Sequence, residues 1–223
     1  LTKVTSKQLL PVYNKPMIFY PLETLLKAGI KDILIIVSPE HSSQYAELLG
    51  NGEQFGARFS YKVQPKPEGL AQAFIIGENF IDGDNVCMIL GDNIFADDFS
   101  DVIKKFKKGG HVFAKEVKDP ERFGVVRFDA AMNVIEIAEK PKKHLSNFAI
   151  TGLYIYDGRV CQAAKEVKPS VRGELEITEL HNWYLKFGEL KVDIVKGEWL
   201  DAGTFDSLFR ASQWAYKKTK GLI

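Results

Sequence analysis

The stretch Val86-Cys87-Met88-Ile89-Leu90-Gly91-Asp92-Asn93 decides the fold that we expect for this chain. Its first five residues are apolar and follow the turn-forming sequence Asp82-Gly83-Asp84-Asn85, which predicts a strand buried on both faces. The run ends in a glycine and a carboxylate, and ligands of open α/β sheets gather beyond the carboxyl ends of the strands. Asp92 could therefore bind a hard cation such as Mg²⁺, or it could simply cap a turn or the following helix.

Helical and strand patterns alternate on both sides of this stretch. Hydrophobic periodicity predicts helices at 17–28, 44–49 and 70–80, with strands at 33–37 and 59–63. Later patterns predict short strands at 111–117, 125–128, 134–138 and 149–156, helices at 159–167 and 176–187, a strand at 190–195 and a helix at 205–218. We expect one domain, 1–223, in which βαβ units carry an antiparallel insertion.

The composition is that of an ordinary soluble globular protein. The 223 residues are 45% hydrophobic and 26% charged, and 30 basic residues against 29 acidic ones leave a net charge of +1. This balance favours neither nucleic acid nor a membrane as partner, and we see no transmembrane run and no signal peptide. Cys87 and Cys161 lie in apolar surroundings and are read as reduced core residues of a cytoplasmic protein. The four histidines lack the spacing of zinc ligands.

Two loops in the first half of the chain could bind a nucleotide. In Ser6-Lys7-Gln8-Leu9-Leu10-Pro11 the Lys7 ammonium is suited to phosphate, although an ordinary solvated lysine fits the sequence as well. In the second loop, 64–73, Gln64 ends a strand and has the donor and acceptor needed to read a base edge. Gly69 could let the backbone approach a flat ring, but a stiff proline-containing turn explains the same residues.

Three clusters in the second half could bind a phosphorylated sugar and a metal. Glu139 and Lys140 end a strand and could meet sugar hydroxyls and a phosphate, or form a solvated ion pair. Arg172 is suited to bidentate phosphate binding. Asp201 lies in a turn, so that Asp92 and Asp201 could converge on one Mg²⁺, as in phosphoryl-type transfer. No Ser/His/Asp triad and no cysteine nucleophile stands out, which favours charge stabilisation over a covalent intermediate.

The order of these motifs resembles the sugar-1-phosphate nucleotidyltransferases over essentially the whole chain. The resemblance rests on eight motifs, namely the stretches 6–17 and 64–73, Leu90-Gly91-Asp92-Asn93-Ile94-Phe95, Phe123-Gly124-Val125-Val126, Glu139-Lys140-Pro141, Thr151-Gly152-Leu153-Tyr154, Arg172-Gly173-Glu174-Leu175-Glu176-Ile177-Thr178 and Trp199-Leu200-Asp201-Ala202-Gly203-Thr204. It is closest to the members that transfer a thymidylyl group from dTTP to glucose 1-phosphate, giving dTDP-glucose and pyrophosphate for rhamnose and deoxysugar synthesis.

The resemblance implies a Rossmann-like three-layer α/β/α fold with a mixed, mostly parallel central sheet and a small antiparallel sugar-binding insertion. Residues 1–106 would bind mainly the nucleotide and residues 107–223 mainly the sugar phosphate, in a homo-oligomer. By the same match Asp92 and Asp201 hold Mg²⁺, and Lys7 contacts the reacting phosphates. The other implied contacts are Gln8, Gln64 and Gly69 to the nucleotide, Gly124, Glu139, Ile150 and Tyr154 to the sugar, and Lys140 and Arg172 to the sugar's phosphate.

The sequence departs from the family pattern at both ends, and alternatives follow. The family's glycine-rich nucleotide loop would stand on a strand before Leu1, and we expect the native protein to begin with it. The helical tail of longer members is also not in this sequence, so their tetramer and allosteric site are in doubt. A UTP-preferring enzyme and a non-catalytic nucleotide-sugar-binding module stay open as alternatives. A dehydrogenase is disfavoured because no Gly-x-Gly-x-x-Gly fingerprint follows a strand.

Overall fold

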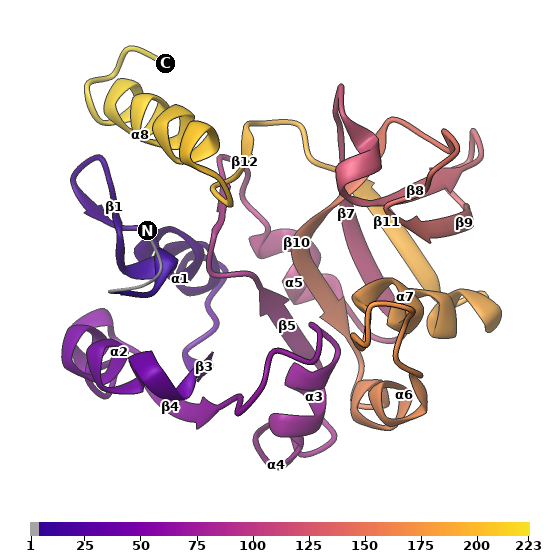
Figure 1. The fold of residues 1–223 in the computed structure, drawn as a ribbon, viewed down its shortest axis with the longest axis horizontal. Helices are drawn as coiled ribbons and strands as arrows, with labels where there is room; N and C mark the ends of the chain where they lie inside the picture. Colours follow the sequence, from indigo (N-terminus) through magenta and orange to yellow (C-terminus); the bar gives the residue numbers. More distant parts are fainter. Residues whose placement is uncertain (1–4) are drawn as a thin grey trace.

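The computed structural model describes residues 5–223, in which helices and strands alternate over most of the chain (Figure 1). The α-helices are α1 (Phe19–Lys27), α2 (Ser42–Leu49), α3 (Gln72–Ile76), α4 (Glu78–Ile81), α5 (Ser100–Lys105), α6 (Val160–Glu166), α7 (Ile177–Lys186) and α8 (Phe205–Thr219). The strands are β1 (Pro11–Val12), β2 (Lys15–Pro16), β3 (Asp32–Val37), β4 (Arg58–Val63), β5 (Val86–Ile89), β6 (Asn93–Phe95), β7 (Gly110–Glu116), β8 (Gly124–Phe128), β9 (Val134–Glu139), β10 (Phe148–Tyr156), β11 (Leu190–Ile194) and β12 (Trp199–Asp201). Short 3-10 turns lie at Lys7–Leu9, Pro39–His41, Glu53–Phe55 and Pro120–Arg122.

The largest sheet in residues 5–223 has six strands of mixed orientation. Its order is β11-β7-β10-β8-β9, and β5 pairs with the second half of β10. Within it β11 and β7 run parallel, whereas the other neighbours are antiparallel. Separate ladders join β3 to β4 in parallel and β6 to β12 in antiparallel orientation.

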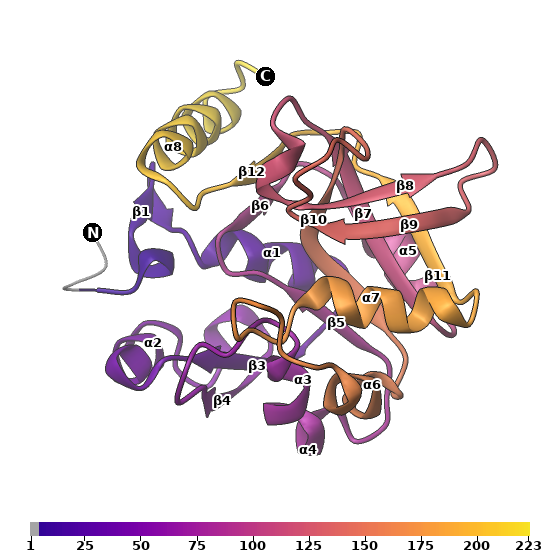
Figure 2. The ribbon, with the colours of Figure 1, turned by 45° about the vertical axis from the view of Figure 1, so that its right-hand side comes forward.

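The predicted mixed α/β class is confirmed, but the prediction of mostly parallel pairing is wrong for this sheet. The strands predicted at 111–117, 125–128, 134–138 and 149–156 do pair in antiparallel orientation, as expected. Of these, β8 and β9 are joined by the short loop 129–133, which permits only an antiparallel neighbour. These four strands are also no insertion beside the first half, because β5 pairs directly with β10. The β8–β9 hairpin projects from the main body (Figure 2).

Alternate residues of the central strands enter two different apolar clusters. Val112 and Tyr154 pack with α6 and α7 in one cluster, while Phe113 and Leu153 pack in another, against which residues of α5 lie. Strand β5 shows the same alternation: Met88 packs on the first cluster and Ile89 on the second. Because side chains of a strand alternate between its faces, the sheet has helices on both sides, with α7 and α5 on opposite faces in Figure 2. This is the expected three-layer arrangement.

Several short elements differ from the sequence expectation. The helix predicted at 70–80 is divided into α3 and α4, because the amide of Gly77 caps the first and Asp82, with φ of 46°, ends the second. Helix α5 and the three-residue strands β6 and β12 were not predicted. No helix within residues 5–223 combines the length and the apolar character needed to cross a membrane. Leu1, before which a further strand is expected, lies outside the described residues.

Candidate functional site

Asp92 lies in the turn between β5 and β6, directly beyond the carboxyl end of β5. Its Oδ2 atom accepts a 2.5 Å hydrogen bond from Nζ of Lys7. Its Oδ1 atom accepts a 3.0 Å hydrogen bond from Nδ2 of Asn93. The Lys7 and Asp92 side chains are 26% and 19% exposed, so this ion pair stands where a solvent-borne ligand can reach it.

Asp201 reaches the same place from the far end of the chain. It is the last residue of β12, where it stands opposite Asn93 of β6, and the next amide, of Ala202, donates to the Asp92 carbonyl oxygen at 2.9 Å. Burial raises the pKa of Asp201, the Asp92 charge raises it further, and Lys7 and Arg122 oppose both effects. Two carboxylates therefore share one partly buried position, where a cation would relieve their repulsion.

The side chain of Asn93 connects these groups. It is 3% exposed, and its Oδ1 atom accepts hydrogen bonds from Nε1 of Trp199 at 2.6 Å and from the amide of Gly152 at 3.0 Å. A Cβ atom on Gly152 would lie only 2.6–2.8 Å from the Asn93 amide group, so glycine is needed there. Asn93 thus joins β6, β10 and β12 to one another at the site.

A cavity of about 230 Å³ opens beside the two carboxylates. Asp92 and Asp201 line it at one end. Five of the residues predicted to bind the sugar and its phosphate also line it, namely Gly124, Glu139, Lys140, Ile150 and Tyr154. The fold therefore brings residues of both halves of the sequence into one cavity.

The β8–β9 hairpin and α7 shape the sugar side of this cavity. Gly124 stands opposite Glu139 in the ladder, and a Cβ atom on Gly124 would lie 2.8 Å from Cγ2 of Thr178 and 3.1 Å from Oε2 of Glu139. Burial raises the pKa of Glu139, as does the Glu176 charge, while Lys140 and Arg172 oppose the shift. Lys140 has a φ of 42°, an uncommon conformation for a residue with a side chain.

Arg172 lies near the cavity but is held by acidic neighbours. Its guanidinium donates to Glu176 at 2.8–3.1 Å and, at 3.5 Å, to Glu139. Glu176 is 7% exposed, so this pairing compensates an otherwise isolated buried charge. A phosphate bound by Arg172 would have to share the guanidinium with Glu176.

Apart from Asp92, which was also predicted to bind the nucleotide, the predicted nucleotide residues lie outside the lining of this cavity. Gln8 packs against Gly91, whose added Cβ atom would lie 2.9 Å from Cγ of Gln8, so it is close to the end of β5. Gln64 donates to Oε1 of Gln72 at 2.6 Å and to the Gly69 carbonyl at 3.5 Å. Gly69 has a φ of 106°, and an added Cβ atom would lie 2.4 Å from the Leu175 carbonyl oxygen.

Sequence reasoning did not assign several residues that line the cavity. Asn93 and Trp199 stood inside the quoted motifs and would have been found by asking which polar side chains flank the two carboxylates. The others are Leu70, Leu90, Arg122, Phe123, Gly152, Ile177, Thr178 and His181. His181 follows the motif at 172–178 by three residues, and only its position on α7 brings it to the cavity.

The donor set fits a hard cation that is shared with a substrate. Within residues 5–223 no three His, Cys, Asp or Glu side chains cluster as a self-sufficient metal site. Asp92 and Asp201 offer carboxylate oxygens, and Mg²⁺ commonly takes one or two carboxylates and completes its shell with water and phosphate oxygens.

Comparison with known proteins supplies the family context. Residues 1–218 match the family model described as nucleotidyl transferase. The chain is 53% identical to a glucose-1-phosphate thymidylyltransferase of Neisseria meningitidis, over 96% of this chain and 76% of that protein. A protein of the same name from Xanthomonas campestris is 50% identical over 96% of this chain and 75% of its own length.

Solved structures agree with this similarity. A crystal structure described as that of a glucose-1-phosphate thymidylyltransferase from Bacillus anthracis, in complex with a sucrose, superposes with a TM-score of 0.91 at 47% identity. It covers 96% of this chain and 88% of that one. A UDP-glucose pyrophosphorylase complexed with UDP-glucose superposes at 0.83 with 24% identity, which shows a shared fold alone.

Proposed function

The chain belongs to the nucleotidyl transferase family, and from that premise we propose that it transfers a thymidylyl group from dTTP to α-D-glucose 1-phosphate. The products are dTDP-glucose and pyrophosphate, which would supply rhamnose or deoxysugar synthesis. One observation carries the proposal: Lys7, Asp92 and Asp201, from three distant parts of the chain, meet at a cavity lined by the predicted sugar residues.

In the proposed reaction an oxygen of the sugar phosphate attacks the α-phosphorus of the nucleotide in line. A new bond forms between that oxygen and the α-phosphorus, and the bond from the α-phosphorus to the bridging oxygen breaks, so that pyrophosphate leaves with the electron pair. The Lys7 ammonium, which is paired with Asp92 here, would offer positive charge to the reacting phosphates. Glu139 and the backbone at Gly124 hold the sugar, and Lys140 and Arg172 bind its phosphate.

We propose Mg²⁺ as the metal that Asp92 and Asp201 hold. When bound, it would neutralise charge on the phosphates and help to align the reacting groups. Asp92, which is paired with Lys7 here, would hold the ion together with Asp201. Lys7 would be free to turn toward a phosphate.

The nucleotide side of the proposal rests on residues outside the cavity. Gln64 and Gly69 would read the thymine, and Gln8 would help to hold the nucleotide, mainly within residues 1–106. The sugar phosphate would be bound mainly by residues 107–223, apart from Asp92.

We further propose that the protein forms a homo-oligomer, a dimer or a tetramer, and works in the cytoplasm, where dTTP is available. Light scattering on the purified protein tests the oligomeric state.

A pyrophosphate-release assay with glucose 1-phosphate and each nucleoside triphosphate tests the function. We expect turnover that requires Mg²⁺ and is fastest with dTTP. UTP lacks one methyl group, which is worth only about 10- to 200-fold in discrimination, so it should be the second substrate. Purine triphosphates should be poor. No pyrophosphate with any nucleotide would contradict the enzyme, and a clear preference for ATP or GTP would contradict the base assignment.

A further inference from the structure

The imidazole of His181 is fully buried, and it has no hydrogen-bond partner within residues 5–223. Its exposed fraction is 0%, and both Nδ1 and Nε2 are unpaired. Buried polar side chains are almost always hydrogen-bonded, so each exception calls for an explanation. The proposed reaction, as derived above, gives this ring no task.

His181 lies on the inner face of α7, one helical turn beyond the residues that border the sugar side of the cavity. Ile177 precedes it by four positions and Thr178 by three, and side chains at those spacings share one face of a helix. All three residues line the 230 Å³ cavity. His181 therefore lies on the cavity side of α7 and not on its solvent side.

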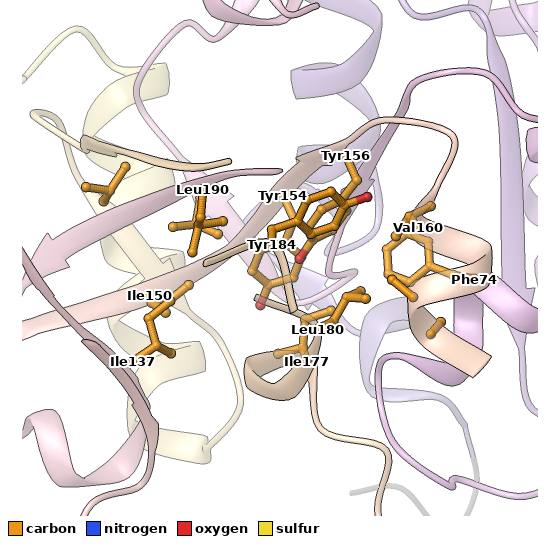
Figure 3. Close-up of a cluster of buried hydrophobic side chains, with 14 of the residues drawn as sticks. Phe74, Ile137, Ile150, Tyr154, Tyr156, Val160, Ile177, Leu180, Tyr184 and Leu190 are labelled. Atoms are coloured by element: carbon orange, nitrogen blue, oxygen red, sulfur yellow. The ribbon is translucent and has the colours of Figure 1, made fainter. Parts of the chain in front are cut away.

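The surroundings of the ring contain aromatic groups but no charge that would hold it. The ring centroids of Tyr154 and Tyr156 lie 5.2 Å and 6.0 Å from that of His181. The two tyrosines stand side by side against α7 in Figure 3, and the hydroxyl of Tyr156 is also buried and unpaired. Burial lowers the pKa of His181 to about 3, so the ring is neutral at any working pH. A neutral imidazole has one N–H donor and one acceptor nitrogen.

A structural role would leave these observations unexplained. If His181 served only to fill space between α7 and β10, an apolar ring would do so without two unpaired nitrogens. The cavity that His181 lines is a space from which a partner could come. A sugar hydroxyl can donate to the acceptor nitrogen of the ring or accept from its N–H group. A single bound water can relay either contact.

We propose that His181 is a specificity-determining residue of the sugar subsite, which pairs with one hydroxyl of the bound sugar 1-phosphate, directly or through one water. This inference rests on the proposed function and adds a residue to it. A site that hydrogen-bonds a substrate hydroxyl rejects the analogue lacking it, because the buried polar group is then left unpaired. The ring would thus help to distinguish glucose 1-phosphate from its deoxy analogues.

The test compares catalytic efficiency, kcat/KM, for glucose 1-phosphate and its 2-, 3-, 4- and 6-deoxy analogues with dTTP. We expect wild type to reject several analogues, since other side chains also face the sugar. In His181→Phe the discrimination against one of them should fall by roughly tenfold or more, while the other ratios stay unchanged. The thermal midpoint should be unchanged or higher, because the substitution removes unpaired polar atoms without emptying the space.

Two further variants make the result decisive. His181→Asn retains a donor and an acceptor and should keep most of the discrimination. His181→Leu is a smaller apolar replacement and carries the test if His181→Phe does not fold. Unchanged ratios for all four analogues in the apolar variant would overturn the proposal. An equal loss of discrimination against all four analogues would also overturn it, as would the failure of both apolar variants to fold. Either result would give His181 a purely structural role in the pocket.

A separate binding measurement distinguishes this proposal from the proposed function. If wild type releases no pyrophosphate, the enzyme assignment fails, and calorimetric titration of wild type and His181→Phe with glucose 1-phosphate and the four analogues still tests His181. The affinity ratio for one analogue should then fall in the variant. Equal ratios in both proteins would overturn the role of His181 whatever the activity.

Discussion

At the scale of single residues, Asp201 should contribute more to the rate of turnover than to the stability of the fold. Its charge is held at a partly buried position beside Asp92, and both burial and that neighbour raise its pKa. Asp201→Asn keeps the side-chain shape but removes a proposed metal ligand. We expect turnover to fall by roughly 100-fold, by analogy with lost metal-site contacts, and the free energy of unfolding near pH 7 to stay the same or rise. Initial rates and urea denaturation measure the two quantities.

The pH dependence of that stability follows from the raised pKa. A carboxyl whose folded pKa lies above its unfolded value binds more protons in the folded state between the two values, so stability falls as pH rises through that window. For Asp201 the window begins near the ordinary value of 3.8 and extends upward. Wild type loses this contribution on going from pH 4 to 7, whereas Asp201→Asn does not. In denaturation curves, the free energy of unfolding of Asp201→Asn relative to that of wild type should therefore increase from pH 4 to pH 7. A relative value that decreases over this range would disprove the prediction.

Asp92→Asn is the informative comparison, because this carboxylate has partners in the folded chain. It would lose the ion pair with Lys7, which is partly exposed and so is worth at most about 1 kcal/mol. Turnover should fall as far as in Asp201→Asn, and the double variant should be hardly slower than the slower single one, since groups that act as a unit are non-additive. Multiplicative losses would indicate two independent roles.

At the scale of elements, long periodic runs were predictable and short ones were not. The helix at 177–186 carries enough helical positions to be recognised, and the strand at 86–89 lies in an unbroken apolar run after a turn, whereas β6 and β12 have three residues each. Their pairing depends on contacts between Trp199 and Phe95, far apart in sequence, which no local pattern contains. The antiparallel pairing of the strands between 110 and 156 was predicted, but their place in the sheet was not: β10 pairs with β5 of the first half, a contact between distant segments that no local pattern contains.

The loop that carries Gly69 offers a test at this scale. Its chain passes so close to Leu175 that an added Cβ atom would lie 2.4 Å from a backbone oxygen, and φ is 106°. Gly69→Ala should destabilise the protein by about 2 kcal/mol or more and raise the KM for dTTP, because the loop must move away from Leu175. Gly188→Ala is the control: φ is 66° but nothing lies within 4 Å, so it should cost only about 1 kcal/mol. Equal effects of both variants would show that the close approach has no consequence.

At the scale of the whole molecule, the sequence predicted which carboxylates meet but not what holds them. Asp92 and Asp201 end up at one cavity, as their positions at element ends suggested. The Asn93 side chain donates to Asp92 and accepts from Trp199 and from Gly152, and these partners become neighbours only when β6, β10 and β12 assemble. Such a contact belongs to the tertiary structure, so it is invisible in any single segment.

Trp199→Phe tests whether that connection serves the metal site. The change removes the 2.6 Å hydrogen bond to Asn93, which keeps its bond from Gly152, so the fold should lose only about 0.5–1.5 kcal/mol. Asn93 would then hold Asp92 less firmly. Groups that orient metal ligands are commonly worth 10- to 100-fold, and we expect the Mg²⁺ concentration for half-maximal activity to rise by roughly tenfold.

Trp183→Phe provides the matched control for that experiment. It also removes an indole hydrogen bond, the 2.8 Å contact with Glu166 on the exposed side of α7, which does not reach the cavity. Its stability should fall by no more than that of Trp199→Phe, with an unchanged Mg²⁺ requirement. Activity titrated against Mg²⁺ at saturating substrates compares the two variants directly. If Trp199→Phe kept the wild-type Mg²⁺ dependence, the Asn93 connection would be a structural joint between β6, β10 and β12 and would not tune the carboxylates.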